Sequence, residues 1–181
     1  MAAKWTDFVS GAVLTAAQLN SVLDNFSDIA IFNETQASGT QGGTNVAATW
    51  TKRTLNTTVV NNIASCTLTS SVISLPAGTY NAKVSTIMHA GSGTTPDAFR
   101  HRLRNTTAGT NLGLSTSGYG GTANNDPLPA EIVTVFTLAA TSNIEVQYYM
   151  TGAVTTVGLG RASIITSTDE IYTQIQITRI A

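Results

Sequence analysis

The feature that most restricts the fold is a succession of short segments rich in Val, Ile and Thr, which fills residues 49–181. Clusters of Gly, Ser, Asn or Pro separate these segments, and no stretch with helical periodicity lies between them. Side chains branched at Cβ favour strands, and strands that follow one another without helices pair antiparallel. We predict about eight strands of useful length and an all-β fold, an antiparallel sandwich or jelly roll. The eight segments are residues 53–60, 72–75, 80–89, 99–105, 132–138, 143–150, 157–166 and 170–180, and a further short strand is expected around residues 112–115.

Residues 1–36 have a different pattern and are predicted to form a docking segment with one short helix. Thr15 and Gln18 have the spacing of a capping box, in which two side chains bond the free amides at a helix start. The apolar residues that follow at helical spacing are Leu19, Val22, Leu23, Phe26 and Ile29. A single helix of this length is unstable in water, so we expect it to pack on its own domain, on copies of itself or on a partner.

Residues 37–48 are rich in Gly and Thr and are predicted to be a linker. They would connect the docking segment to a β jelly-roll domain formed by residues 49–181. An ordinary surface loop and a hinge are both consistent with this composition.

Charged residues make up only 10% of the chain, against roughly 25% in typical soluble domains. A surface with so little charge is either neutral and polar or covered by other subunits. The net charge of −1 gives no long-range attraction for nucleic acid or an anionic membrane, so neither is predicted as a partner. The N-terminus lacks the apolar segment of a secretory signal, and no segment is apolar for long enough to span a bilayer.

Few residues are suited to catalysis or metal binding, so we predict no enzyme activity, no cofactor and no metal site. His89 and His101 lie in strand segments without metal-ligand spacing, and we interpret both as sheet histidines with satisfied hydrogen bonds. The single cysteine, Cys66, is expected to be a small buried apolar residue. The adjacent carboxylates Asp169 and Glu170 are expected to point to opposite faces of a strand, a poor arrangement for acid and base catalysis.

Arg100, Arg102 and Arg104 alternate along one segment and are expected to point to the same face of a sheet. Like charges this close repel one another unless they are neutralised. Two interpretations remain open. One is a solvated face paired with Glu145 or Glu131, and the other is a polar subunit interface or an anion site for a glycan or a neighbouring protein. No aromatic residue interleaves with these arginines along the segment, which argues against nucleic acid.

A loop rich in Gly, Ser and Asn at residues 117–127 carries Tyr119, with Asn124 and Asp126 beside it. A tyrosine ring stacks on sugars, and amide and carboxylate groups bond their hydroxyls. These three residues, together with the three arginines, are therefore candidate contacts for a ligand or an anion. The alternative is a flexible loop between strands that binds nothing.

Two parts of the chain resemble known families. Residues 5–25 resemble the N-terminal region of structural proteins of tailed bacteriophages, in which a run of the form G-x-V-L-T-A-A-x-L-N opens a short helix; the run here extends from Gly11 to Asn20. Most of the remainder resembles the trimeric C1q/TNF-like jelly rolls of virion fibres and decoration proteins. The matching pieces are residues 53–57, 75–80, 102–105, 136–138 and 170–177.

The resemblance implies a homotrimeric capsid decoration or head-fibre protein on the virion surface, made in the host cytoplasm. Its partner would be the major capsid protein or another virion protein, and its jelly roll would project outward. Because the chain has no long shaft, a head location is favoured over the alternative, a tail-fibre protein that recognises a host-surface glycan. The residues assigned to virion docking are Trp5, Phe8, Leu14, Leu19, Val22, Leu23 and Phe26. Those assigned to the trimer interface are Tyr172, Ile175 and Ile177, in a last strand near the threefold axis.

Overall fold

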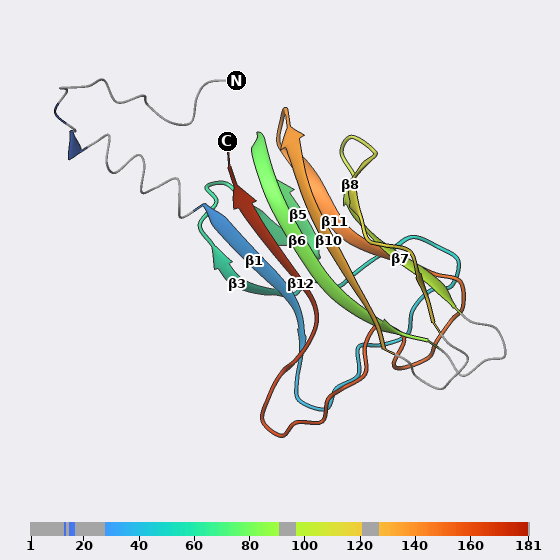
Figure 1. The fold of residues 1–181 in the computed structure, drawn as a ribbon. Coiled ribbons are helices and arrows are strands. Elements are labelled where there is room, and N and C mark those ends of the chain that lie inside the picture. Colours follow the sequence, from blue (N-terminus) through green and yellow to red (C-terminus); the bar gives the residue numbers. More distant parts are fainter. Residues whose placement is uncertain (1–12, 14, 17–27, 91–96, 121–126, 181) are drawn as a thin grey trace.

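The computed structural model describes residues 13, 15–16, 28–90, 97–120 and 127–180, and these residues form two β-sheets packed face to face (Figure 1). The strands of the first sheet are β1 (Ile29–Gln36), β3 (Thr57–Asn61), β6 (Gly78–His89), β10 (Pro127–Leu138) and β12 (Glu170–Arg179). Those of the second sheet are β2 (Thr51–Lys52), β4 (Thr67–Thr69), β5 (Val72–Leu75), β7 (Ala98–Asn105), β8 (Thr110–Leu114), β9 (Gly118–Tyr119) and β11 (Ser142–Met150).

Every pair of neighbouring strands in the described residues is antiparallel. The first sheet has the order β10-β6-β12-β1-β3 and the second the order β4-β5-β11-β7-β8, with β2 paired to β11 and β9 paired to β7. In β7 the side chains of Phe99, His101 and Leu103 are buried, and the intervening arginines are half-buried on the outer face. Strict alternation of this kind fixes which side of a strand faces the core. The predicted all-β antiparallel sandwich is confirmed.

The first strand lies where the sequence predicted the end of a helical segment. β1 pairs with β12 on one side and with β3 on the other, and its Phe32 is fully buried. The predicted boundary at residue 36 is therefore wrong, because residues 29–36 belong to the sandwich. Ile29 fits a helical stripe and an alternating strand equally well, and hydrogen bonding to two neighbouring strands favours the strand. The predicted helix itself lies almost entirely outside the described residues.

The segment predicted as one strand at residues 53–60 is divided, because the chain crosses there from one sheet to the other. The Arg53 N–H donates to the Val146 carbonyl in the second sheet at 2.8 Å. The Asn56 N–H donates to the Asn33 carbonyl in the first sheet at 2.9 Å. This crossing places the Arg53 side chain between the two sheets, where it is fully buried.

The predicted linker, residues 37–48, packs against the loop at residues 151–169. The Gly42 and Gly43 N–H groups donate to the carbonyls of Gly160 and Thr156, and Asn45 is only 2% exposed. The two loops lie together beyond the sheets, at the opposite end from the C-terminus (Figure 1, cyan and red-brown). The segment is therefore a fixed loop rather than a free linker.

The strand predicted at residues 157–166 is wrong, since these residues belong to the second of the packed loops. Thr156 has φ 66° and Ile164 has φ 60°. Residues with such dihedral angles turn the chain and cannot continue an extended strand. Val and Ile content alone favoured a strand here, and packing against residues 37–48 overrides that preference.

The core contains two apolar clusters separated by a polar layer. The larger cluster includes Val84, Leu103 and Ile175, and the smaller one includes Met88, Phe99 and Met150. Between them, at the intermediate inward positions of β6, β7 and β12, lie the buried polar residues Thr86, His101 and Thr173. Among the described residues, no helix has the length and apolarity needed to cross a membrane.

Candidate functional site

The outward face of the first sheet is nearly free of net charge, and we call it the neutral face. Its side chains form cross-strand rows made of Ile29, Thr178, Asn81 and Val135; Ile31, Gln176, Lys83 and Val133; and Asn33, Gln174, Ser85 and Glu131; with Ile87 and Ile171 at one end. The Lys83 and Glu131 side chains form an exposed ion pair of 2.7 Å. Val133, Val135 and Ile171 are 67%, 62% and 53% exposed. Exposed apolar side chains gathered on one sheet face are typical of a contact surface.

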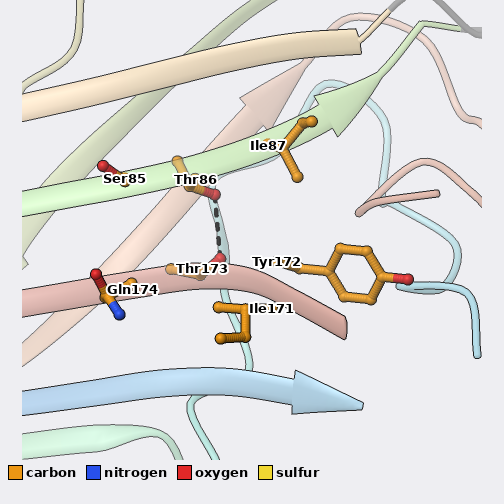
Figure 2. Close-up of a pocket in the computed structure, with 7 residues that line it drawn as sticks. All are labelled: Ser85, Thr86, Ile87, Ile171, Tyr172, Thr173 and Gln174. Atoms are coloured by element: carbon orange, nitrogen blue, oxygen red, sulfur yellow. Dashed lines mark hydrogen bonds between the residues drawn. The ribbon is translucent and has the colours of Figure 1, made fainter. Parts of the chain in front are cut away.

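A shallow pocket of about 430 Å³ lies at the Ile87 end of the neutral face (Figure 2). Ile87 of β6 and Ile171 of β12 lie on opposite sides of it, and the Tyr172 ring extends toward one end. Thr86 and Thr173 are also lining residues, and their buried hydroxyls meet at 3.1 Å beneath the pocket. The pocket is therefore a mainly apolar recess.

The three residues assigned to a trimer interface point into the core of the chain itself. Tyr172 is 3% exposed, and Ile175 and Ile177 are fully buried. Their assignment to an intersubunit surface is therefore corrected: on β12 the side chains that face outward are Ile171, Gln174 and Gln176. The pattern of the segment predicted one apolar face, and the sandwich uses that face for its own core.

The polar layer is organised by an ion pair that the sequence analysis did not detect. Arg53 and Glu34 are essentially unexposed, and their Nη2 and Oε2 atoms lie 2.7 Å apart. The Thr173 hydroxyl accepts from Arg53 Nε at 2.8 Å and donates to Glu34 at 2.9 Å, and Arg53 also donates to the Leu159 carbonyl. Burial raises the pKa of Glu34 and lowers that of Arg53, and the attraction between the two groups opposes both shifts. The pair thus connects β1, β12 and the loop at residues 151–169 to residues 53–56, where the chain crosses between the sheets.

His101 lies in the same layer and is fully buried. Neither of its ring nitrogens, nor Arg53 Nη1, hydrogen-bonds a group in the part of the chain that the structure describes. The interpretation of His101 as a histidine with satisfied hydrogen bonds is therefore wrong. Burial, and to a smaller extent the Arg53 charge, lowers the pKa of His101 to about 3, so the ring is neutral at physiological pH.

The outward face of the second sheet carries a concentration of positive charge, and we call it the basic face. It is formed by Lys52, Arg100, Arg102, Arg104, Trp50, Tyr149, Glu145 and Gln147. Glu145 is the single carboxylate in the strands of this sheet, against four cationic side chains from Lys and Arg. The Arg102 guanidinium lies over the Trp50 ring at 4.2 Å from its centroid. The Trp50 and Tyr149 rings have their centroids 5.5 Å apart.

The predicted alternation of the three arginines on one face is present in the structure. Ion pairs with Glu145 or Glu131, which one of the two interpretations required, are not found for these arginines among the described residues. Glu131 lies on the other sheet and pairs with Lys83. Glu145 lies 3.9 Å from Lys52 and accepts from Gln147. The aromatic rings beside the arginines come from neighbouring segments, because Trp50 directly precedes β2 and Tyr149 lies on β11. The pattern of the arginine segment alone does not reveal them.

The other predicted contact residues are only partly placed. Tyr119 lies on β9 and is 71% exposed. Asn124 and Asp126 lie outside the described residues. The docking residues also lie outside the described part of the chain; they are Trp5, Phe8, Leu14, Leu19, Val22, Leu23 and Phe26.

The Asp169–Glu170 pair has no catalytic arrangement, because the carboxylate of Glu170, the first residue of β12, bonds the packed loops. Its carboxylate accepts from the N–H groups of Gly39, Ser163 and Ile164 and from the Ser163 hydroxyl. These bonds, chiefly the one from the Ser163 amide, lower the pKa of Glu170. Within the described residues, no three His, Cys, Asp or Glu side chains gather in a way that would hold a metal ion.

The fold resembles solved structures, although no family model and no curated protein matches the chain. A crystal structure of murine APRIL at pH 5.0 superposes with a TM-score of 0.52 at 8% identity, covering 83% of this chain and 97% of the other. The structure of Eiger TNF from S. frugiperda gives a TM-score of 0.51 at 14% identity, covering 84% of this chain and 92% of the other. The globular domain of zebrafish complement 1qA protein gives a TM-score of 0.46 at 12% identity. The first two similarities support the predicted jelly-roll fold, of the TNF-like type.

Proposed function

We propose that this chain is a non-enzymatic structural protein that forms a homotrimer and decorates the surface of a bacteriophage virion. The trimer is held through the neutral face, and residues before β1 dock on the major capsid protein or another virion protein. The jelly roll then projects from the particle, with the basic face on its exposed side.

The observation that carries the proposal is the neutral face. Val133, Val135 and Ile171 are more than half exposed on a sheet whose opposite side already fills the core. A flat sheet face with apolar side chains and a single ion pair loses little on leaving water, since few charges have to be desolvated. The TNF-like fold and the low charge of the chain support association through this surface.

The virion role is supported by the sequence rather than by the sandwich. The run from Gly11 to Asn20 matches the helix-opening region of phage structural proteins. It precedes a sandwich that begins at Ile29, so the docking residues and the jelly roll are separate in sequence. This division is what an anchored decoration protein requires.

Sedimentation equilibrium tests the trimer. We expect a mass three times the 18.9 kDa of one chain. A mass of one chain at every concentration measured would contradict the trimer and leave the neutral face without a partner of its own kind.

Immunogold labelling of intact particles with an antibody against residues 45–181 tests the location. Gold on the heads is the expected result and supports a decoration or head-fibre role. Gold at the tail tip would favour a receptor-binding protein instead. Unlabelled particles, with an antibody that still binds the free protein, would contradict a place on the virion surface.

A further inference from the structure

We propose that the basic face is a binding site for an acidic polysaccharide, whose carboxylate or sulphate groups the arginines bind and whose sugar rings contact Trp50 and Tyr149. The inference concerns a surface outside the neutral face, and it does not depend on the virion role or on the trimer.

The charge on this face is incompletely neutralised. Arg100, Arg102 and Arg104 form a row with about 7 Å between successive residues, the repeat of alternate positions on a strand. Within the described residues none of the three forms an ion pair. Burial, together with repulsion from Arg104, lowers the pKa of Arg102, and Glu145 opposes this only in part. A bound anion would relieve the repulsion along the row.

Each of the three guanidinium groups is held by one side-chain hydrogen bond to the described residues, so most of its donors have no partner in that part of the chain. Arg100 Nε donates to the Ser115 carbonyl at 3.1 Å, and Arg102 Nε donates to Gln147 Oε1 at 2.7 Å. Arg104 donates from Nη1 to the Asn111 side chain at 3.0 Å. A guanidinium has five N–H donors, so each arginine keeps several for an anionic ligand. Groups fixed before binding lose less conformational entropy when the ligand arrives.

The aromatic and amide groups of the face suit a sugar. Trp50 and Tyr149 are half-buried, so parts of both rings remain on the surface beside the arginine row. Apolar faces of sugar rings pack on such side chains. The amide oxygens of Gln147 and Asn111 accept from Arg102 and Arg104, and their N–H groups are donors suited to sugar hydroxyls.

The same features argue against two other polyanions. A DNA backbone has no hydroxyl donor for the Glu145 carboxylate of this face, whereas a polysaccharide has several. An acidic peptide would use the arginines but would give the aromatic rings no specific role. An acidic polysaccharide uses the charges, the rings and the amides.

The test is a binding titration with the full-length protein at about 0.15 M salt, where the Debye length is about 8 Å and weak non-specific attraction is screened. The probes are hyaluronan and dextran sulphate, with neutral dextran, poly-glutamate and oligo-dT as comparisons. We expect saturable binding to at least one of the two acidic polysaccharides and at most weak binding to the three comparison probes.

Variants place the site. Arg102→Gln/Arg104→Gln is expected to weaken polysaccharide binding about tenfold or more, because charge-assisted bonds to the anionic groups are lost. Arg161→Gln/Arg179→Gln removes the same charge from residues outside the basic face and is expected to change binding less than about twofold. Tyr149→Ser is expected to weaken polysaccharide binding but not the residual binding of poly-glutamate.

Three outcomes would overturn the inference. The first is absence of binding to both acidic polysaccharides, and the second is equal loss of binding in the two double variants. The third is binding of poly-glutamate or oligo-dT as tight as that of the polysaccharide, which would make the face a general anion surface. The sedimentation mass is measured on the same samples, so a failure of the trimer is recognised separately from a failure of this site.

Discussion

At the scale of single residues, Arg53 and Glu34 are the pair on which the interior depends. Two opposite charges without solvent contact are stable only while both are present, because either one alone would be an unpaired charge in a medium that solvates it poorly. Thr173 bonds both partners, so the loss of one partner also disturbs a strand at the centre of the first sheet.

We predict that Arg53→Met lowers the free energy of unfolding by about 3–5 kcal/mol. The double variant Glu34→Leu/Arg53→Met should recover most of this loss, since it removes both charges and fills the layer with apolar groups. Urea unfolding followed by circular dichroism measures both. A double variant no more stable than Arg53→Met would show that the pair contributes through its geometry rather than by compensation of charge.

His101 makes the interior sensitive to acid. Its pKa is about 3 in the folded chain and 6.5 as a reference value, so the unfolded chain binds a proton more readily. The free energy of unfolding is therefore fully retained above about pH 6.5 and falls as the pH decreases toward 3, by about 1.4 kcal/mol per pH unit.

Urea unfolding of wild type and His101→Leu across this pH range measures the effect. Glu34 titrates in both proteins, so the difference between the two curves isolates the histidine. We expect the His101→Leu protein to lose less stability on acidification. Parallel curves would mean that His101 becomes protonated without cost in the folded state.

Residues differ in how far the sequence predicts their place. Alternation along one segment is local information, and it put the three arginines on one face correctly. The partner of Arg53 could not be predicted in the same way, because Glu34 comes from a segment that also fits a helical pattern. A contact between two sheets depends on where the chain crosses, and no local pattern records that crossing.

At the scale of elements, β12 shows that an apolar face predicts burial but not what covers it. The sequence assigned Ile175 and Ile177 to an intersubunit surface, but the sandwich itself covers them. The outward residue Ile171 is the better probe of association, because it is 53% exposed on the neutral face.

We predict that Ile171→Lys weakens self-association at least about tenfold, since a lysine buried in the interface would need a partner. Val46→Lys is the matched control, because Val46 is 51% exposed in the loop at residues 37–48. Sedimentation equilibrium of both variants gives the comparison. Equal masses for Ile171→Lys and wild type at all concentrations would move the interface away from the neutral face.

At the scale of the whole molecule, the long strands and their turns could be predicted because they depend on local alternation. The start of the sandwich could not, because β1 is a strand only in the presence of β12 and β3. This difference determines where the chain can be shortened.

We predict that a chain lacking residues 1–27 folds and associates like wild type but no longer binds particles. A chain lacking residues 1–36 should fail to fold, since it loses the buried Phe32 and leaves Arg53 without Glu34. Thermal unfolding and co-sedimentation with particles test the two deletions. Particle binding by the shorter deletion would contradict docking through the N-terminal residues.

Ile29 pairs with Thr178, so the chain enters and leaves the sandwich at one end, and the packed loops lie at the other (Figure 1). For peptide display, this geometry makes a fusion before the first residue equivalent to a fusion after the last residue. Under the proposed docking, cargo added after the last residue would crowd the particle as much as cargo added before the first. An insertion between Thr166 and Ser167, in the exposed far loop, would carry a foreign epitope away from the shell.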